Sequence, residues 1–154
     1  GKPMPGCELA VLDDDGHPVP AGTTGEIGVR RREGWFRSKD LGSVDEEGYY
    51  HYAGRADDVI ISAGWTISPL EVEPSLVSHP DVLEAAVVGA PDETRGKIVK
   101  AYLVSGRRDP GFVAEVQDFV RATLSRHEYP RQIELVDDLP KTVNGKIDRK
   151  ALRT

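Results

Sequence analysis

Lys146 and Asp40 have residue types and sequence settings that could do chemistry. Lys146 follows Asn144-Gly145 in the stretch LPKTVNGKIDRKAL. Because Asn-Gly is the strongest two-residue hairpin signal, a tight turn would present the Lys146 ammonium at a loop tip. There it is either a mobile point charge for a phosphate or a developing oxyanion, or a solvated surface lysine. Asp40, in WFRSKDLG, is either an acceptor for sugar hydroxyls or a β-turn aspartate.

The stretch YAGRADDVIISAG, residues 52–64, is where the sequence changes character. Before it, short β-type runs alternate with Gly turns, and after it β runs alternate with amphipathic helical patterns. Arg55, Asp57 and Asp58 lie at this junction, directly before an apolar run. The junction either bends or binds a ligand, or it is an ordinary solvated turn that enters a strand.

Two further positions are candidates for binding. Gly64, followed by Trp65, is either a turn glycine or a place where a ligand passes close to the main chain. Arg131, in HEYPRQIEL, either pairs with a phosphate or is a solvated strand end. No metal site is predicted, because the four histidines lack metal-ligand spacing. The sequence also contains no GxxxxGK[ST] phosphate loop.

Composition bounds the class of protein. The 154 residues fit one domain, or one small domain with an appendage. A net charge of -6 argues against a general nucleic-acid binder. The apolar runs are too short to cross a bilayer, and the single cysteine, Cys7, fits a reducing compartment. We therefore expect a soluble, cytoplasmic protein with no membrane span and no nucleic-acid partner.

The first 55 residues predict antiparallel β structure with little core of its own. Strands are expected at residues 6–12, 25–31, 41–44 and 49–52. The aromatic residues Trp35, Phe36 and Tyr49 are expected to pack against a surface outside this chain. Their exposure in this chain would favour self-association.

The residues after the junction predict a small α+β domain with two or three helices on about three strands. A helix over residues 68–78 is expected, because Ser68 can cap it, Pro69 fits its first position and Glu71 can close a capping box. A second helix is expected to begin with Asp109 as its cap and Pro110 at its first position. Strands are expected at residues 59–62, 82–88, 98–104 and 132–136, with a hairpin at 141–147 and a short last helix capped by Asp148.

Taken together and in this order, five stretches resemble the end of adenylate-forming enzymes, the family that includes acyl-CoA synthetases. They are GEIGVR, GWFRSKDLGSVDEEGYYHYAGRADDVIISAG, ISPLEVE, HPDVLEAAVVGAPDETRGKIVKAYLV and LPKTVNGKIDRKAL. The resemblance extends from Gly25 to Leu152. Such enzymes use ATP to convert a carboxylic acid into an acyl-adenylate and then transfer the acyl group to a thiol. The stretches ISPLEVE and YPRQIE are most like those of CoA ligases for medium-chain or aromatic acids.

The resemblance implies a role for each candidate. Asp40 would hold the ribose hydroxyls of ATP, and Arg55 would assist near the same ribose or phosphate. Asp57 would be the hinge about which a C-terminal lid rotates between half-reactions. Lys146 would stabilise the α-phosphate and carboxylate oxygens during adenylation.

The same resemblance implies where CoA binds. The Gly64 loop with Trp65 would line the pantetheine tunnel, and Arg131 would contact the CoA phosphates. Two departures matter: Ser38-Lys39-Asp40 replaces the family's usual Thr-Gly-Asp, and Tyr129 is neutral where some relatives are basic.

The resemblance also implies a domain division. Residues 1–56 would be the end of a large domain's β subdomain, and residues 57–154 the mobile lid. The phosphate loop, the adenine motif, the acid pocket and most Mg²⁺ ligands would lie upstream, so the chain alone is expected to be inactive. An adenylation domain that loads a carrier protein and a non-catalytic interaction module are the alternatives.

Overall fold

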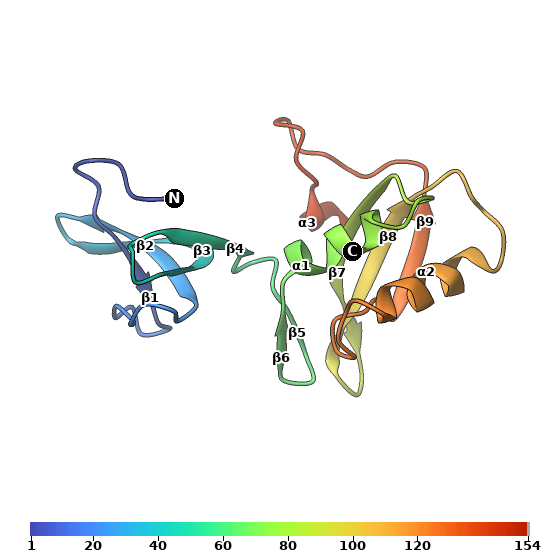
Figure 1. The fold of residues 1–154 in the computed structure, drawn as a ribbon, viewed down its shortest axis with the longest axis horizontal. Helices are drawn as coiled ribbons and strands as arrows, with labels where there is room; N and C mark the ends of the chain where they lie inside the picture. The colour runs from blue at the N-terminus through green and yellow to red at the C-terminus, as the bar shows by residue number, and fades with distance from the viewer. Residues whose placement is uncertain (154) are drawn as a thin grey trace. The chain divides into compact units, whose positions relative to one another are not determined.

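The computed structural model describes residues 1–153, and the chain forms two compact units. The first unit ends at Asp57 and the second begins at Asp58. Among the described residues, the regular elements of the first unit are strands, and helices α1, α2 and α3 belong to the second unit (Figure 1).

The first unit is a four-stranded antiparallel sheet in the order β1-β2-β3-β4. Its strands are β1 (Leu9–Leu12), β2 (Gly25–Arg31), β3 (Gly34–Val44) and β4 (Tyr50–Arg55). The strand expected at residues 41–44 is therefore much longer at its N-terminal side and includes Trp35 and Phe36. The register of β3 shifts against both neighbours, which places irregular backbone around Asp40.

The first unit has little core. Among residues 1–57, the buried hydrophobic side chains are Val11 and Leu12, each 1% exposed. Gly28 allows Leu12 to pack on the sheet, because a Cβ at Gly28 would lie 2.4 Å from Leu12 Cδ1. Phe36 and Tyr49 are exposed, so self-association through them stays a prediction.

The second unit confirms the α+β class. Its sheet has the order β7-β8-β9, with β7 and β8 antiparallel and β8 and β9 parallel. A separate hairpin, β5-β6, precedes it. The elements are β5 (Ile60–Ser62), β6 (Trp65–Ile67), α1 (Pro69–Val77), β7 (Glu84–Asp92), β8 (Gly96–Val104), α2 (Phe112–Arg121), β9 (Gln132–Val136) and α3 (Arg149–Leu152).

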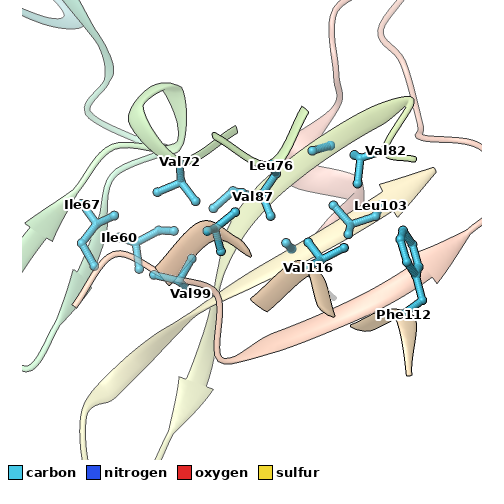
Figure 2. Packing of buried hydrophobic residues seen from close by; sticks show 13 residues of the cluster. Ile60, Ile67, Val72, Leu76, Val82, Val87, Val99, Leu103, Phe112 and Val116 are labelled. Atoms are coloured by element: carbon cyan, nitrogen blue, oxygen red, sulfur yellow. The ribbon is translucent and has the colours of Figure 1, made fainter. Parts of the chain in front are cut away.

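Side chains pack on both faces of this sheet. Successive strand residues point to opposite faces, so Val87 and Leu103 join the larger cluster, while Val88 and Tyr102 join the smaller one. Figure 2 shows the larger cluster, to which α1 and α2 contribute Val72, Leu76, Phe112, Val116 and Val120. The smaller cluster is covered by residues that follow β9: Leu139, Ile147 and Leu152.

The two longer helices start for different reasons. Ser68 caps α1 as expected, since its side chain accepts a hydrogen bond from the Leu70 N–H at 3.3 Å, and Pro69 is the first residue. The prediction that Asp109 caps α2 was wrong. The helix starts at Phe112 after Gly111, without a side-chain cap, because the Asp109 carboxylate pairs instead with Arg107 at 2.9 Å.

No helix within residues 1–153 is long and apolar enough to cross a membrane.

The two-sided packing predicts a large difference between two leucines of the second unit. Leu76 is fully buried and Leu83 is 66% exposed. Leu76→Ala should lower the free energy of unfolding by roughly 2–5 kcal/mol, because it removes buried methyl groups and leaves a cavity. Leu83→Ala, the matched control, should change it by less than about 0.5 kcal/mol. Urea denaturation followed by helical circular dichroism, which reports on this unit alone, measures both. Equal effects would contradict the assigned core.

Candidate functional site

Asp40, Arg55 and Asp57 form one charged group in the first unit. Asp40 on β3 pairs in register with Arg55 on β4. The Arg55 guanidinium lies 3.1 Å from Asp40 Oδ1 and 3.3 Å from Asp57 Oδ2. The hydrogen bond to Asp57 and then that to Asp40 raise the pKa of Arg55, against the opposing effect of desolvation. Each side chain is between 38% and 52% exposed, so a ligand can reach all three.

The backbone beside Asp40 is held by a network of short contacts. The Ser38 hydroxyl donates to the Ile27 carbonyl at 2.6 Å and accepts from the Asp40 N–H at 3.0 Å. The Lys39 N–H donates to Glu26 Oε1 at 2.8 Å. Burial by itself would raise the pKa of Glu26. The hydrogen bonds that Glu26 accepts from Arg37 and then from the Lys39 N–H outweigh this effect and lower the pKa. The network fixes where the Asp40 carboxylate lies.

Lys39 has a backbone conformation that normally favours glycine. Its φ is +63°, in the left-handed region. This explains why a glycine suits the position, and why the lysine is a departure. The Lys39 ammonium lies 3.9 Å from Asp57 Oδ1 and therefore adds positive charge beside the Arg55 group.

Lys146 is presented at a hairpin tip, as its sequence predicts. Lys141 and Ile147 form an antiparallel bridge, and the Thr142 N–H donates to the Lys146 carbonyl at 2.7 Å. Gly145 closes the turn with φ +76°. Within residues 1–153, no carboxylate pairs with the exposed Lys146 ammonium, so its charge is available to a ligand.

Gly64 lies in the tight turn of the β5-β6 hairpin, and Trp65 is the first residue of β6. Ala63 and Gly64 have φ of +48° and +83°, which allows a two-residue connection. Space beside Gly64 is open, since a Cβ there would meet no atom within 4 Å. Trp65, 56% exposed, stacks on the His127 ring with centroids 4.1 Å apart.

Arg131 lines a pocket of about 310 Å³ with Arg121, Leu124, Arg126 and Tyr129. The guanidinium groups of Arg121 and Arg131 lie 4.9 and 5.2 Å from the Tyr129 ring centroid. Arg121 pairs with Asp118, whereas Arg126 and Arg131 form no ion pair within the described part of the chain. This concentration of positive charge suits a phosphate-bearing ligand.

The turn at residues 125–131 connects the arginine pocket to Trp65. Arg126 lines the pocket, and the next residue, His127, stacks on Trp65. Ser125 fixes the turn through His127 Nε2 at 3.1 Å and through the Glu128 carboxylate. Sequence reasoning missed Arg121, Arg126 and His127, although the basic and aromatic stretch SRHEYPR was a signal.

Asp13, Asp15 and His17 place three possible metal-ligand atoms within 4.8 Å of one another. The sequence prediction, which found no metal spacing, missed this proximity. The His17 N–H donates to Asp13 Oδ1 at 2.8 Å in the exposed β1-β2 connection, so turn formation accounts for the cluster.

Residues 71–146 match the family model of the AMP-binding enzyme C-terminal domain. Arg131 and Lys146 lie within this range, whereas Asp40, Arg55, Asp57, Gly64 and Trp65 precede it. The fold and the match define the class: the second unit carries the C-terminal domain of AMP-binding enzymes.

The relatives narrow the class further. The chain is 39% identical to the human mitochondrial acyl-coenzyme A synthetase ACSM1 and 40% identical to the uncharacterized acyl-CoA ligase YtcI of Bacillus subtilis. Among solved structures, the o-succinylbenzoate CoA synthetase of Bacillus subtilis, in complex with its acyl-adenylate intermediate, is similar with a TM-score of 0.88 and 33% identity. The second unit belongs to the family of AMP-binding enzyme C-terminal domains, and over nearly its whole length the chain is similar to acyl-CoA synthetases.

The chain spans about a third of the length of these relatives. The matches include 99% of this chain but 31% of ACSM1 and 33% of YtcI, and the structural match covers 100% of this chain and 35% of the synthetase. The alignment with ACSM1 extends over 184 residues, so that relative carries additional residues within the matched region.

The left-handed backbone at Lys39 predicts an order of stability among three substitutions. All three remove the ammonium near Asp57, so differences among them report on the backbone. Lys39→Gly should be the most stable, Lys39→Ala intermediate, and Lys39→Val the least stable by roughly 1–3 kcal/mol, because a β-branched side chain opposes positive φ. Urea denaturation followed by Trp35 fluorescence, in a Trp65→Phe background, measures the order. If Lys39→Gly were the least stable variant, the left-handed φ at residue 39 would not be what determines the order of stability.

Proposed function

We propose that this chain is the C-terminal portion of an ATP-dependent acid-CoA ligase. The full enzyme would convert a carboxylic acid and ATP into acyl-adenylate and pyrophosphate, and would then transfer the acyl group to CoA with release of AMP. Similarity to acyl-CoA synthetases over nearly the whole chain supports this reaction class. The observation that carries the assignment is Lys146, exposed and without a carboxylate partner within residues 1–153, at the tip of a glycine-closed hairpin.

Lys146 would act in the first half-reaction. When the acid carboxylate attacks the α-phosphate, negative charge accumulates on oxygens of both groups. A lysine ammonium that reaches these oxygens stabilises the transition state more than the ground state, which raises the rate. The hairpin suits this role because it holds the backbone while the long side chain stays mobile.

Asp40 and Arg55 would bind the nucleotide. An ionised carboxylate has about four acceptor positions, and Arg55 takes one of those on Asp40, so others are available to ribose hydroxyls. The Arg55 guanidinium also fixes the orientation of the Asp40 carboxylate. Lys39, which lies near Asp57, adds a positive charge that can assist the phosphates of ATP.

Asp57 would be the hinge. It is the last residue of the first unit, and the second unit begins at the next residue. Rotation of the second unit as a lid would need large backbone changes at only a few residues there. Residues 1–56 would then belong to the large N-terminal domain and residues 57–154 would be the lid, and one active site could serve two half-reactions.

CoA would bind along the surface formed by the β5-β6 turn and the arginine pocket. The open space at Gly64 suits passage of the pantetheine chain close to the backbone. Trp65 would supply an apolar wall, and Arg131, with Arg121 and Arg126, would pair with CoA phosphates.

The rest of the catalytic machinery would come from the large N-terminal domain of the full enzyme. Mg²⁺ would arrive with ATP and be held largely there. When bound, this ion would neutralise phosphate charge. The chain alone should form no acyl-adenylate.

Two alternatives give different outcomes in the same assay. An adenylation domain for a carrier protein would form acyl-adenylate but not acyl-CoA. A non-catalytic interaction module would form neither, and Lys146 would then be dispensable in the full-length protein.

The first test replaces Lys146 in the full-length enzyme that contains this chain. Mass spectrometry would follow acyl-CoA with ATP, CoA and a panel of medium-chain and aromatic acids, and hydroxylamine would trap acyl-adenylate. Lys146→Ala should lower acyl-adenylate formation by roughly 100–1,000-fold, similar to the loss of one preorganised oxyanion donor. The exposed neighbour Val143→Ala is the control and should retain activity. Adenylation that survives Lys146→Ala would contradict the proposed role.

The second test compares CoA with dephospho-CoA, which lacks the 3′-phosphate. If the arginine pocket binds that phosphate, Arg131→Ala should raise KM for CoA by roughly 10-fold or more, as expected for a lost charge-assisted hydrogen bond. KM for dephospho-CoA should change little. Arg108→Ala, which removes an exposed arginine paired with Asp137, is the control. An equal rise for both thiols would place the 3′-phosphate elsewhere.

A further inference from the structure

Arg149 and Glu73 form the least exposed ion pair among residues 1–153. The Arg149 Nη2 group donates to Glu73 Oε1 at 2.7 Å and to Oε2 at 2.6 Å. Their side chains are 15% and 12% exposed. Glu73 Oε1 also accepts the Val87 N–H at 2.9 Å. One carboxylate therefore joins α1, β7 and the first residue of α3.

Asp58 extends this group to the boundary between the units. Asp58 Oδ2 lies 3.7 Å from Arg149 Nη1, and Oδ1 accepts a hydrogen bond from Arg153. Asp58 directly follows Asp57, the proposed hinge. The C-terminal segment is thus attached to the chain one residue beyond the point about which the lid would rotate.

A short and well-packed path connects Arg149 to Lys146. Ile147 packs on the smaller hydrophobic cluster, and the Asp148 N–H donates to the Pro140 carbonyl at 2.8 Å. Asp148 also caps α3 by accepting the Lys150 and Ala151 N–H groups. Movement of Arg149 would therefore shift the base of the Lys146 hairpin.

Stability alone is a weak reason for such a group. Replacing a buried ion pair by apolar residues of similar size is often neutral or stabilising. Arg149 Nε is moreover buried without a partner within the described residues, which is a further cost. The gain that an ion pair offers over apolar contacts is direction, because the Arg149 Nη2 group must face both oxygens of the Glu73 carboxylate.

We propose that Glu73 and Arg149, together with Asp58, are positioning residues that fix the Lys146 hairpin relative to the hinge. Neither Glu73 nor Arg149 is assigned contact with substrate, so each acts through Lys146. The proposal rests on the proposed function: Lys146 serves adenylation, and rotation of the lid about Asp57 would carry Lys146 out of the site before thioester formation. Loss of the group should therefore impair the first half-reaction selectively.

The test uses Glu73→Gln in the full-length enzyme. Acyl-adenylate formation should fall by roughly 10–100-fold in kcat, the cost of a misplacement near 1 Å. Thioester formation from synthetic acyl-adenylate and CoA should remain at the wild-type rate. Glu134→Gln, which breaks the Lys100 pair at 2.8 Å in the same unit, is the matched control and should affect neither half-reaction. An equal loss in both half-reactions would indicate a structural role and overturn the proposal.

A double mutant tests whether the effect passes through Lys146. In a Lys146→Ala background, Glu73→Gln should cause little further loss of residual adenylation, because the group it positions is absent. Additive losses would overturn the proposal.

Hydrogen exchange on the 154-residue chain separates this proposal from the proposed function. Glu73→Gln should speed amide exchange at Thr142 and Gly145, whose N–H groups are bonded within the hairpin, and Glu134→Gln should not. Unchanged exchange would refute the positioning role whatever the enzyme catalyses. A wild-type enzyme without ligase activity, but with the expected exchange, would refute only the proposed function.

Discussion

The β7-β8-β9 sheet of the second unit is buried on both faces, and the placement of its functional side chains depends on this. Helices α1 and α2 cover one face, and the residues after β9 cover the other. The second covering is a chain segment without long helices, held by Leu139, Ile147 and Leu152. The Lys146 hairpin belongs to this segment, so the packing that completes the core also presents the ammonium.

Features determined by neighbouring residues could be predicted from the sequence. Asn144-Gly145 indicated the hairpin beneath Lys146, and Ser68-Pro69 indicated the start of α1, because turn and cap preferences act over a few residues. Prediction failed where a distant or competing partner determines which contacts a side chain makes. Asp109 has the chemistry of a cap, but Arg107 takes its carboxylate, and α2 begins later.

The site shows the same division between local and distant determinants. Asp40, Arg55 and Asp57 were identified as chemistry-bearing residues, but their convergence requires the register between β3 and β4. Lys39, with its left-handed φ, lies where the pairing of β3 with β2 is irregular. In the sequence, the only sign of this was a lysine at a position where the family usually has glycine. The residues that line the arginine pocket all lie between Arg121 and Arg131, but only the turn after α2 brings them together around one pocket.

Glu73 and Arg149 lie 76 residues apart, which explains why neither attracted attention in the sequence. A side chain that touches a reacting group needs a specific chemical type and a local turn, and both leave traces in a short stretch. A side chain that positions another needs only a partner brought near by the fold. Positioning residues are therefore found by following the contacts of a reactive segment back into the core. Here that path runs from Lys146 through Arg149 to Glu73 and Asp58, and it ends beside the proposed hinge.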